Sequence, residues 1–131
     1  MKVKRLYLID DDEDDVLLFC EALAQIPLPV ELTPFTDCRA AFKHLEEGNI
    51  PDVIFLDLNM PHIDGKEFMG MLKGIQDFNS PIIIYSTSNF QRDIEDSMAL
   101  GAADYVIKQG DFGKLCSSLK NVLYEKVYLS A

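Results

Sequence analysis

A single aspartate, Asp57, directly follows an apolar run at residues 53–56. A run of four apolar residues bounded by turn signals is typical of a strand buried on both faces of a parallel sheet. In such sheets, ligands and reacting groups collect at the carboxyl ends of the strands. We therefore expect Asp57 to be a nucleophile, a metal ligand or a loop cap.

Polar side chains follow three other apolar runs. Six consecutive acidic residues, 10–15, come after the first run, Ser86 after the fourth and Lys108 after the last. We expect the carboxylates, the hydroxyl and the ammonium to converge on one cleft. Clustered carboxylates need a cation, and oxygen ligands with room for water suit Mg²⁺. The hydroxyl and ammonium would donate to phosphoryl oxygens while Asp57, as nucleophile, forms an acyl phosphate.

Each residue also has a purely structural interpretation. Acidic residues at a helix N-terminus interact favourably with the helix dipole, by about 0.3–1 kcal/mol per charge. This interpretation suits residues 13–15, but it does not explain Asp10 and Asp11 at a strand end. Taken singly, a serine at a strand end is more often a cap, a lysine a solvated charge, and Tyr105 a core or rim residue. Their joint occurrence at four strand ends favours a site.

Strand and helix patterns alternate strictly along the chain. Apolar runs predict strands at residues 3–9, 30–35, 53–56, 82–85 and 105–107. Apolar residues recur at helical spacing after each strand: Val16, Phe19, Cys20, Leu23 and Ile26; Cys38, Ala41, Phe42 and Leu45; Phe68, Met71, Leu72 and Ile75; Ile94, Met98 and Leu100; Phe112, Leu115, Leu119 and Val122. The alternation predicts a doubly wound α/β fold, with a five-stranded parallel sheet, five helices on its two faces and right-handed crossovers.

Cap residues mark several helix boundaries. Asp37 and Asp111 are expected to N-cap the second and fifth helices, and Ser88 with Gln91 fits a capping box before the fourth. Residues 125–131 are expected to form a helix end with a short tail.

Length and composition favour one domain, residues 1–131, of an ordinary soluble globular protein. The formal charge of −10 opposes direct binding to nucleic acid or an anionic membrane. No stretch has the length of a transmembrane helix or of the apolar core of a signal peptide. The cysteines, Cys20, Cys38 and Cys116, lack a paired spacing, so we expect reduced core residues of a cytoplasmic protein.

Several motifs together resemble the receiver domain of two-component response regulators over essentially the whole chain. They are the pair Asp10-Asp11, the segment 57–65 (Asp-Leu-Asn-Met-Pro-His-Ile-Asp-Gly), Pro81 leading into Ser86, and the segment 101–108 (Gly-Ala-Ala-Asp-Tyr-Val-Ile-Lys). Each motif alone is weak, but their joint order and spacing are highly specific. The resemblance implies a flavodoxin-like, CheY-like sheet with strand order 2-1-3-4-5.

The resemblance also implies roles at the acidic site. Asp57 would accept a phosphoryl group from the phosphohistidine of a histidine kinase or phosphotransfer protein. Mg²⁺ would be held by Asp11, Asp57, the backbone carbonyl of Asn59 and, through water, Asp10.

Three further roles follow from the resemblance. Ser86 would be the switching hydroxyl, Lys108 would pair with the phosphoryl oxygens, and Tyr105 would be the aromatic switch. Ser86 is chosen over Thr87 because it lies five residues after Pro81, as in the family. The fourth helix, fifth strand and fifth helix would form the surface that binds an unknown downstream target.

This sequence departs from the family pattern near the site. Gln109, followed by Gly110, stands where the family usually has Pro, commonly after a cis peptide bond, so the resemblance leaves the geometry of this loop open. Thr87 replaces a residue that is often smaller. Asn59 and Ser88 occupy positions that tune the phosphoryl lifetime in the family.

Three other classes of site fit less well. A haloacid-dehalogenase-type phosphatase needs a second Asp two residues after the nucleophile, where Asn59 stands and cannot transfer a proton. An EF-hand loop over residues 10–21 needs Gly in place of Asp15 and a helix before it. An FMN carrier would share the fold, but its phosphate could not lie beside six consecutive carboxylates.

We therefore expect a stand-alone receiver with no output domain, acting as a non-enzymatic phosphoacceptor that binds proteins, as a monomer or a phosphorylation-dependent dimer. A receiver excised from a longer regulator or hybrid kinase is the main alternative.

Overall fold

The computed structural model describes residues 2–129 and contains one five-stranded parallel sheet, in the order β2-β1-β3-β4-β5. The strands are β1 (Lys4–Ile9), β2 (Val30–Phe35), β3 (Val53–Leu56), β4 (Ile82–Ser86) and β5 (Asp104–Ile107). The helices are α1 (Glu13–Ala24), α2 (Cys38–Glu46), α3 (Gly65–Leu72), α4 (Gln91–Ala99) and α5 (Phe112–Leu123). The expected fold class and strand order are therefore confirmed, and strand bounds differ from expectation by at most one residue.

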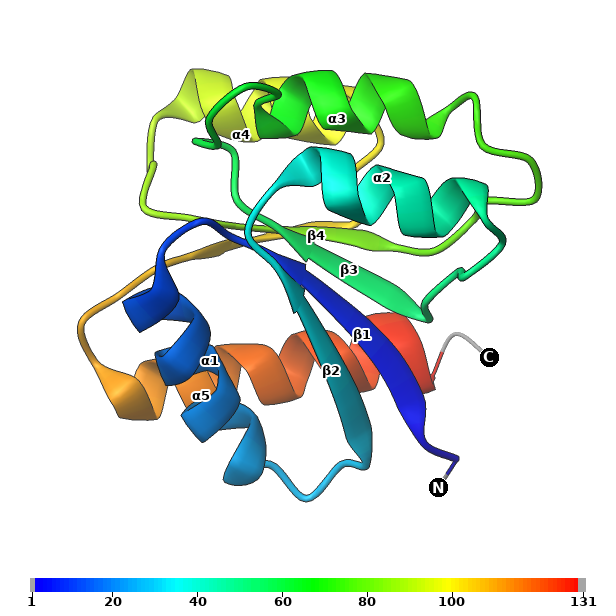
Figure 1. Ribbon diagram of the computed structural model, residues 1–131. Coiled ribbons are helices and arrows are strands. Elements are labelled where there is room, and N and C mark those ends of the chain that lie inside the picture. The colour runs from blue at the N-terminus through cyan, green and yellow to red at the C-terminus, as the bar shows by residue number, and fades with distance from the viewer. Residues whose placement is uncertain (1, 130–131) are drawn as a thin grey trace.

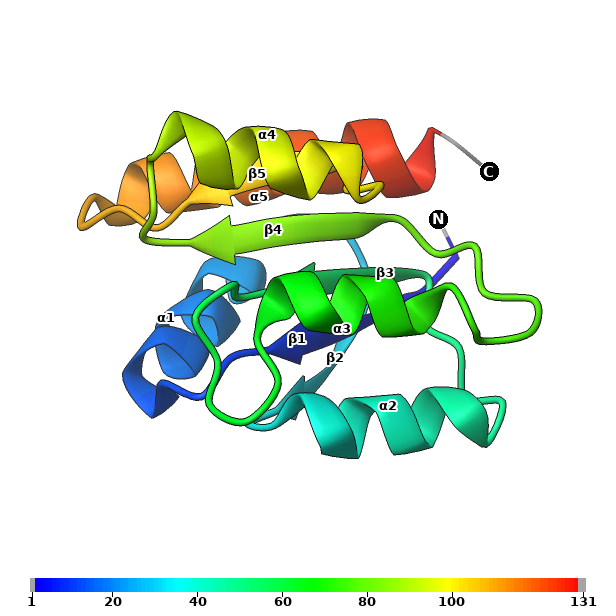
Figure 2. The same ribbon diagram turned by 90° about the horizontal axis from the view of Figure 1, so that it is seen from above.

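The helices cover the sheet in two layers. Helices α1 and α5 lie on one face, and α2, α3 and α4 lie on the other (Figure 1). Figure 2 shows α2, α3 and α4 in succession across their face. This arrangement leaves the carboxyl ends of the strands free to carry a site.

The alternation of side chains along each strand divides the core in two. In β1, Leu6 and Leu8 belong to the cluster that packs against α1 and α5, whereas Tyr7 and Ile9 belong to the cluster that packs against α2 and α3. Strands β3 and β4 alternate in the same way and are buried throughout. Because both faces of a parallel sheet are covered, the central strands read as continuous apolar runs.

Two of the expected helix caps are confirmed and one is wrong. The Asp37 and Asp111 carboxylates accept backbone N–H groups at the starts of α2 and α5. Helix α4 begins after Phe90, which makes no side-chain cap hydrogen bond. The expected capping box of Ser88 and Gln91 therefore does not form, because Ser88 lies two residues before the cap position and its hydroxyl accepts the Phe90 N–H.

The cysteine expectation is only partly correct. Cys38 is buried, but Cys116 is half-buried and Cys20 is exposed. Helix α1 packs against the sheet through Phe19 and Ala22, and the residue after Phe19 is turned away from the core by the helical rotation of about 100°.

Helices α4 and α5 also expose residues expected on their apolar faces. Met98 is 45% exposed and Phe112 is 37% exposed. The one buried residue of α4 is Ser97, whose hydroxyl donates to the Asp93 carbonyl at 2.7 Å. A polar contact within the helix thus replaces part of the expected apolar packing.

The chain after α5 remains helical. Residues Tyr124–Tyr128 form a π-helical turn, and the Tyr128 hydroxyl donates to the Pro29 carbonyl before β2. The helix end expected within residues 125–131 is therefore present, and residues 130–131 of that stretch lie outside the described residues. None of the described helices is long and apolar enough to cross a membrane.

The first residue of α3 lies directly against the chain that follows β3. The Gly65 N–H donates to the Leu58 carbonyl at 3.0 Å. A Cβ atom at Gly65 would lie 2.7 Å from the Asp57 carbonyl oxygen and 2.8 Å from the Leu58 Cα. Glycine is required here because any side chain would collide with backbone that cannot move without displacing Asp57.

We predict opposite effects of alanine at two glycines of α3. Gly65→Ala should lower the free energy of unfolding by roughly 1–3 kcal/mol through overpacking. The matched control Gly70→Ala should raise it by about 0.4–1 kcal/mol, because its Cβ would meet nothing within 4 Å. Urea unfolding of both variants measures the difference, and a neutral Gly65→Ala would contradict the close approach.

Candidate functional site

The strand register places three charged residues on the same face of the sheet. Asp10 continues the alternation of Leu6 and Leu8, and Asp57 continues that of Val53 and Phe55. Side chains two residues apart in a strand point to the same face, so both carboxylates lie on the face covered by α1 and α5.

Lys108 reaches this same face from the end of β5. It follows Val106, which packs in the cluster under α1 and α5. Its N–H donates to the Ser86 carbonyl at 2.8 Å, which fixes the lysine backbone beside the end of β4. All peptide bonds among residues 2–129 are trans, including the bond between Lys108 and Gln109.

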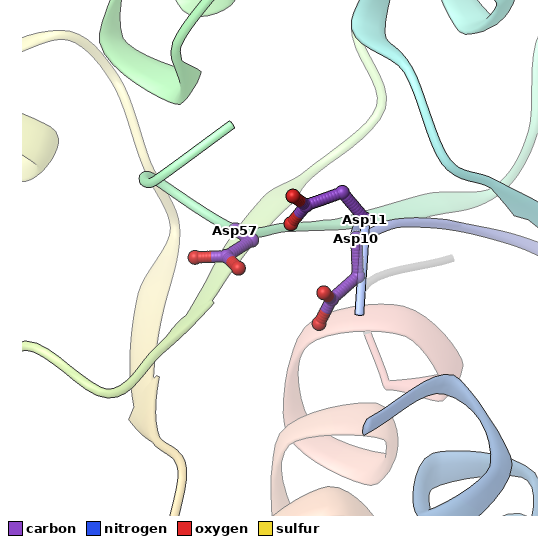
Figure 3. A group of neighbouring side chains, drawn as sticks. All are labelled: Asp10, Asp11 and Asp57. Atoms are coloured by element: carbon purple, nitrogen blue, oxygen red, sulfur yellow. The ribbon is translucent and has the colours of Figure 1, made fainter. Parts of the chain in front are cut away.

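Three carboxylates cluster at the ends of β1 and β3. Figure 3 shows Asp57 beside Asp10 and Asp11, and one oxygen of each carboxylate lies within 4.8 Å of the others. Asp10 and Asp57 are buried, while Asp11 is exposed. Two unit charges at that separation repel by roughly 3 kcal/mol at an effective dielectric constant of about 20. The cluster therefore favours binding of a cation.

The Lys108 ammonium lies among three carboxylates, two of which belong to this cluster. Its Nζ is 2.7 Å from Asp10 Oδ2, 2.9 Å from Asp15 Oδ2 and 3.1 Å from Asp57 Oδ2. The lysine side chain is only 8% exposed. Together with Asp11, four carboxylates thus lie near one ammonium, and most of the negative charge remains unbalanced.

Burial and ion pairing have opposing effects on the titration of these groups. Burial raises the pKa of Asp10 above its ordinary value, even though contact with Lys108 lowers it. Burial by itself lowers the pKa of Lys108, but its contacts with Asp10 and Asp15 outweigh this and raise the pKa above its ordinary value. The lysine is therefore a permanent cation of the site.

One oxygen at the centre of the site lacks a full set of hydrogen-bond partners. Asp10 Oδ2 is fully buried, and its one close partner is the Lys108 ammonium, 2.7 Å away. Because the same ammonium is shared with Asp15 and Asp57, this buried oxygen is incompletely satisfied, which is costly. The residues present therefore fit a small divalent cation, which Asp10, Asp11 and Asp57 could hold through oxygen atoms.

The structure adds a contact to the helix-dipole interpretation of Asp15. The residue lies in the first turn of α1, and its carboxylate contacts Lys108 at 2.9 Å. A signal for this contact is present in the sequence, since Asp15 lies four residues before Phe19 and so on the inward side of the helix. The helix dipole accounts equally for every acidic residue in the first turn of α1. It therefore does not indicate that Asp15, unlike its neighbours, contacts Lys108.

By the alternation of side chains along β4 and β5, Ser86 and Tyr105 lie on the face of the sheet opposite to the carboxylate cluster of Asp10 and Asp57. Ser86 continues Ile82 and Ile84, is fully buried, and accepts the Ser88 N–H at 3.2 Å. Tyr105 is half-buried, and its hydroxyl donates to the Ser88 carbonyl at 2.8 Å. Both residues are thus linked to the β4–α4 loop.

Asn59 adjoins the cluster through its backbone. Its N–H donates to Asp57 Oδ1 at 3.1 Å, and the residue is exposed. A cavity of about 470 Å³ opens beside it. The lining residues are Asp11, Leu58, Asn59, Met60, Pro61, Asp64, Lys66 and Asp93. The site is therefore accessible from the side of α3 and α4.

A second set of ion pairs, which the sequence did not indicate, joins α3 to α4 at this cavity. Lys66 Nζ lies 2.8 Å from Asp93 Oδ1 and 3.1 Å from Asp96 Oδ2. The other Asp93 oxygen accepts the Ser88 hydroxyl. Ser88 is thus the meeting point of hydrogen bonds from Tyr105 in β5 and to Asp93 in α4.

Known proteins share both the sequence and the fold of this chain. Response regulator Rcp1 of Synechocystis sp. is 29% identical over 138 residues, which cover 98% of this chain and 94% of that protein. The nitrate/nitrite response regulator protein NarL of Escherichia coli (strain K12) is 31% identical over 86 residues, covering 66% of this chain. That match spans only 39% of the length of NarL.

Solved structures of two response regulators superpose closely. The phosphorylated cyanobacterial phytochrome response regulator RcpA gives a TM-score of 0.85 at 30% identity, covering 99% of this chain and 97% of that chain. The Mn²⁺-bound form of Rcp1 gives a TM-score of 0.82 at 27% identity, covering 95% and 94%. A family model described as the response regulator receiver domain matches residues 6–120. This chain therefore belongs to the response regulator receiver domain family, and it is a receiver domain.

Proposed function

We propose that this receiver accepts a phosphoryl group on Asp57. The observation that carries the proposal is the placement of a buried carboxylate, at the end of a central strand, 3.1 Å from the ammonium of Lys108. An Asp57 oxygen attacks the phosphorus atom of a phosphohistidine, the P–N bond breaks, and the imidazole leaves. The product is an acyl phosphate on Asp57, and Lys108 donates to its oxygens.

Receivers of this family bind a divalent metal, and we propose Mg²⁺ for this chain. Asp11, Asp57 and the Asn59 carbonyl would bind the ion, and Asp10 would bind it through water. When bound, the cation supplies charge that stabilises the negative oxygens of the transferring group. Two observations support this assignment: Asp10 Oδ2 is buried with incomplete hydrogen bonding, and the three carboxylates are spaced to hold one ion. The Mn²⁺-bound form of Rcp1 supports a divalent ion in a similar protein.

We propose that phosphorylation acts on the binding surface through Ser86 and Tyr105. Movement of the Ser86 hydroxyl toward the new phosphoryl oxygens would break its bond with the Ser88 N–H. Because the Tyr105 hydroxyl is bonded to the Ser88 carbonyl, the loop and the ring would rearrange together. The surface formed by α4, β5 and α5 would then change its affinity for a target protein.

Receiver domains interact with histidine kinases or phosphotransfer proteins, and we propose such a protein as the phosphodonor here. The match covers 94% of Rcp1 but only 39% of NarL, so receivers similar to this chain occur both as nearly a whole protein and as part of a longer one. The signalling role is non-enzymatic, because Asn59 lacks the acid that rapid phosphate turnover would need.

Phosphoryl uptake by the parent protein is the first expected result. Incubation with a small phosphodonor and Mg²⁺ should add one phosphoryl group, detected as a mass increase of the intact protein. Asp57→Asn should abolish the increase, because an amide is not a nucleophile, and a chelator should prevent it in the parent. The matched control Asp14→Asn removes an exposed carboxylate from α1 and should take up phosphate normally. An unmodified parent, with metal binding established and rapid turnover excluded, would contradict the proposal.

Ser86→Ala should separate phosphoryl uptake from switching. The variant should still be modified on Asp57, but the phosphorylation-dependent change in backbone hydrogen exchange across α4 and β5 should shrink at least severalfold. Thr87→Ala is the matched control, since Thr87 is the neighbouring hydroxyl and is exposed. Equal exchange changes in the two variants would exclude Ser86 as the switching hydroxyl.

A further inference from the structure

Asp15 differs from the other carboxylates around Lys108. Asp10 and Asp57 contact the ammonium and also belong to the trio spaced to hold a cation. Asp15 contacts the ammonium at 2.9 Å but is not one of the trio. It is therefore the only one of the three partners whose contact with Lys108 does not compete with a metal.

A divalent cation and Lys108 cannot both retain the same oxygens. The Asp10 and Asp57 carboxylates would be attracted to a bound cation, which would also repel the nearby ammonium. The lysine side chain is 8% exposed, so moving its charge into solvent requires the site to open. A third carboxylate beside the ammonium removes this difficulty, because it keeps the charge paired while the other two change partners.

The position of Asp15 is not explained by helix capping. Asp12 is the N-cap of α1, and its carboxylate accepts the N–H groups of Asp14 and Asp15. Glu13 and Asp14 also supply negative charge to the first turn, and both are exposed. Among these acidic residues, Asp15 is the one with an ion pair to Lys108 at the end of β5, across 93 residues of sequence.

We propose that Asp15 is a positioning residue, which holds the Lys108 ammonium beside Asp57 while a divalent cation binds Asp57 directly and Asp10 through water. The inference rests on the proposed function, because it assumes the metal site. Without Asp15, the ammonium depends on Asp10 and Asp57 alone and competes more strongly with the metal. The carboxylate of Asp15 thus makes metal binding and lysine placement compatible.

The test is a double-mutant cycle read out as Mg²⁺ affinity. Calorimetric titration of the whole chain with Mg²⁺ should give a dissociation constant about fivefold or more higher for Asp15→Asn than for the parent, within the usual range for residues of one ion-pair network. Asp14→Asn, which removes the same charge from the same helical turn, should change it less than twofold. Lys108→Met should bind Mg²⁺ more tightly than the parent, because the competing cation is gone.

The second arm of the cycle tests whether Asp15 affects Mg²⁺ affinity by positioning Lys108 or only through its negative charge. In the Lys108→Met background, adding Asp15→Asn should have no larger effect than adding Asp14→Asn. Asp15→Glu, which keeps the charge, should recover most of the lost affinity, and circular dichroism verifies that each variant folds. If Asp15→Asn does not fold, Asp15→Ser takes its place.

Two results would overturn the inference while leaving the metal site intact. One is an equal loss of affinity in Asp15→Asn and Asp14→Asn, which would indicate a general charge effect. The other is an undiminished effect of Asp15→Asn in the Lys108→Met background, which would mean that Asp15 acts on the metal without the lysine. A parent protein that binds no Mg²⁺ would overturn the proposed function together with this inference.

Discussion

Negative charge exceeds positive charge at the carboxyl edge of the sheet, and the arrangement of the site depends on this excess. One buried ammonium, Lys108, lies within 3.1 Å of three carboxylates, and a fourth, Asp11, adjoins them. Ionised groups removed from water are stable only when paired, and a single cation cannot satisfy this many carboxylates. The unbalanced charge favours binding of a further cation, and this environment underlies the proposal that Asp57 forms an acyl phosphate.

The fold brings these groups together through the two-residue repeat of its strands. Residues that continue the buried alternation of β1, β3 and β5 emerge on one face, which is covered by α1 and α5. Helix α1 contributes Asp15 to the same face. On the other face, Gly65 lets α3 pack against the backbone of Asp57 and Leu58, so the position of Asp57 is fixed by a contact that admits no side chain.

A second polar network connects the site with the surface. The Ser88 carbonyl accepts a hydrogen bond from the Tyr105 hydroxyl, and the Ser88 hydroxyl donates one to Asp93. Asp93 also forms an ion pair with Lys66. These contacts join α3, α4, the β4–α4 loop and β5 along the side opposite the carboxylate cluster. Ser86 contacts residues of both networks, because its carbonyl accepts the Lys108 N–H and its hydroxyl accepts the Ser88 N–H.

The sequence alone determined the class of fold and, through its family resemblance, the strand order. It also determined the trio Asp10, Asp11 and Asp57, because strand-end residues are set by hydrophobic runs that are local in sequence. Tertiary structure decided the rest. The pairing of Asp15 with Lys108 spans 93 residues. The local pattern places Asp15 on the inward side of α1, four residues before Phe19, but it does not identify the distant lysine as its partner. The start of α4 was misplaced for a related reason: Ser88 has the composition of a cap, but its hydroxyl is bonded to Asp93 and to the Phe90 N–H, so the helix begins later. Residues that act through long-range contacts are fixed by packing, and packing exists only once the chain has folded.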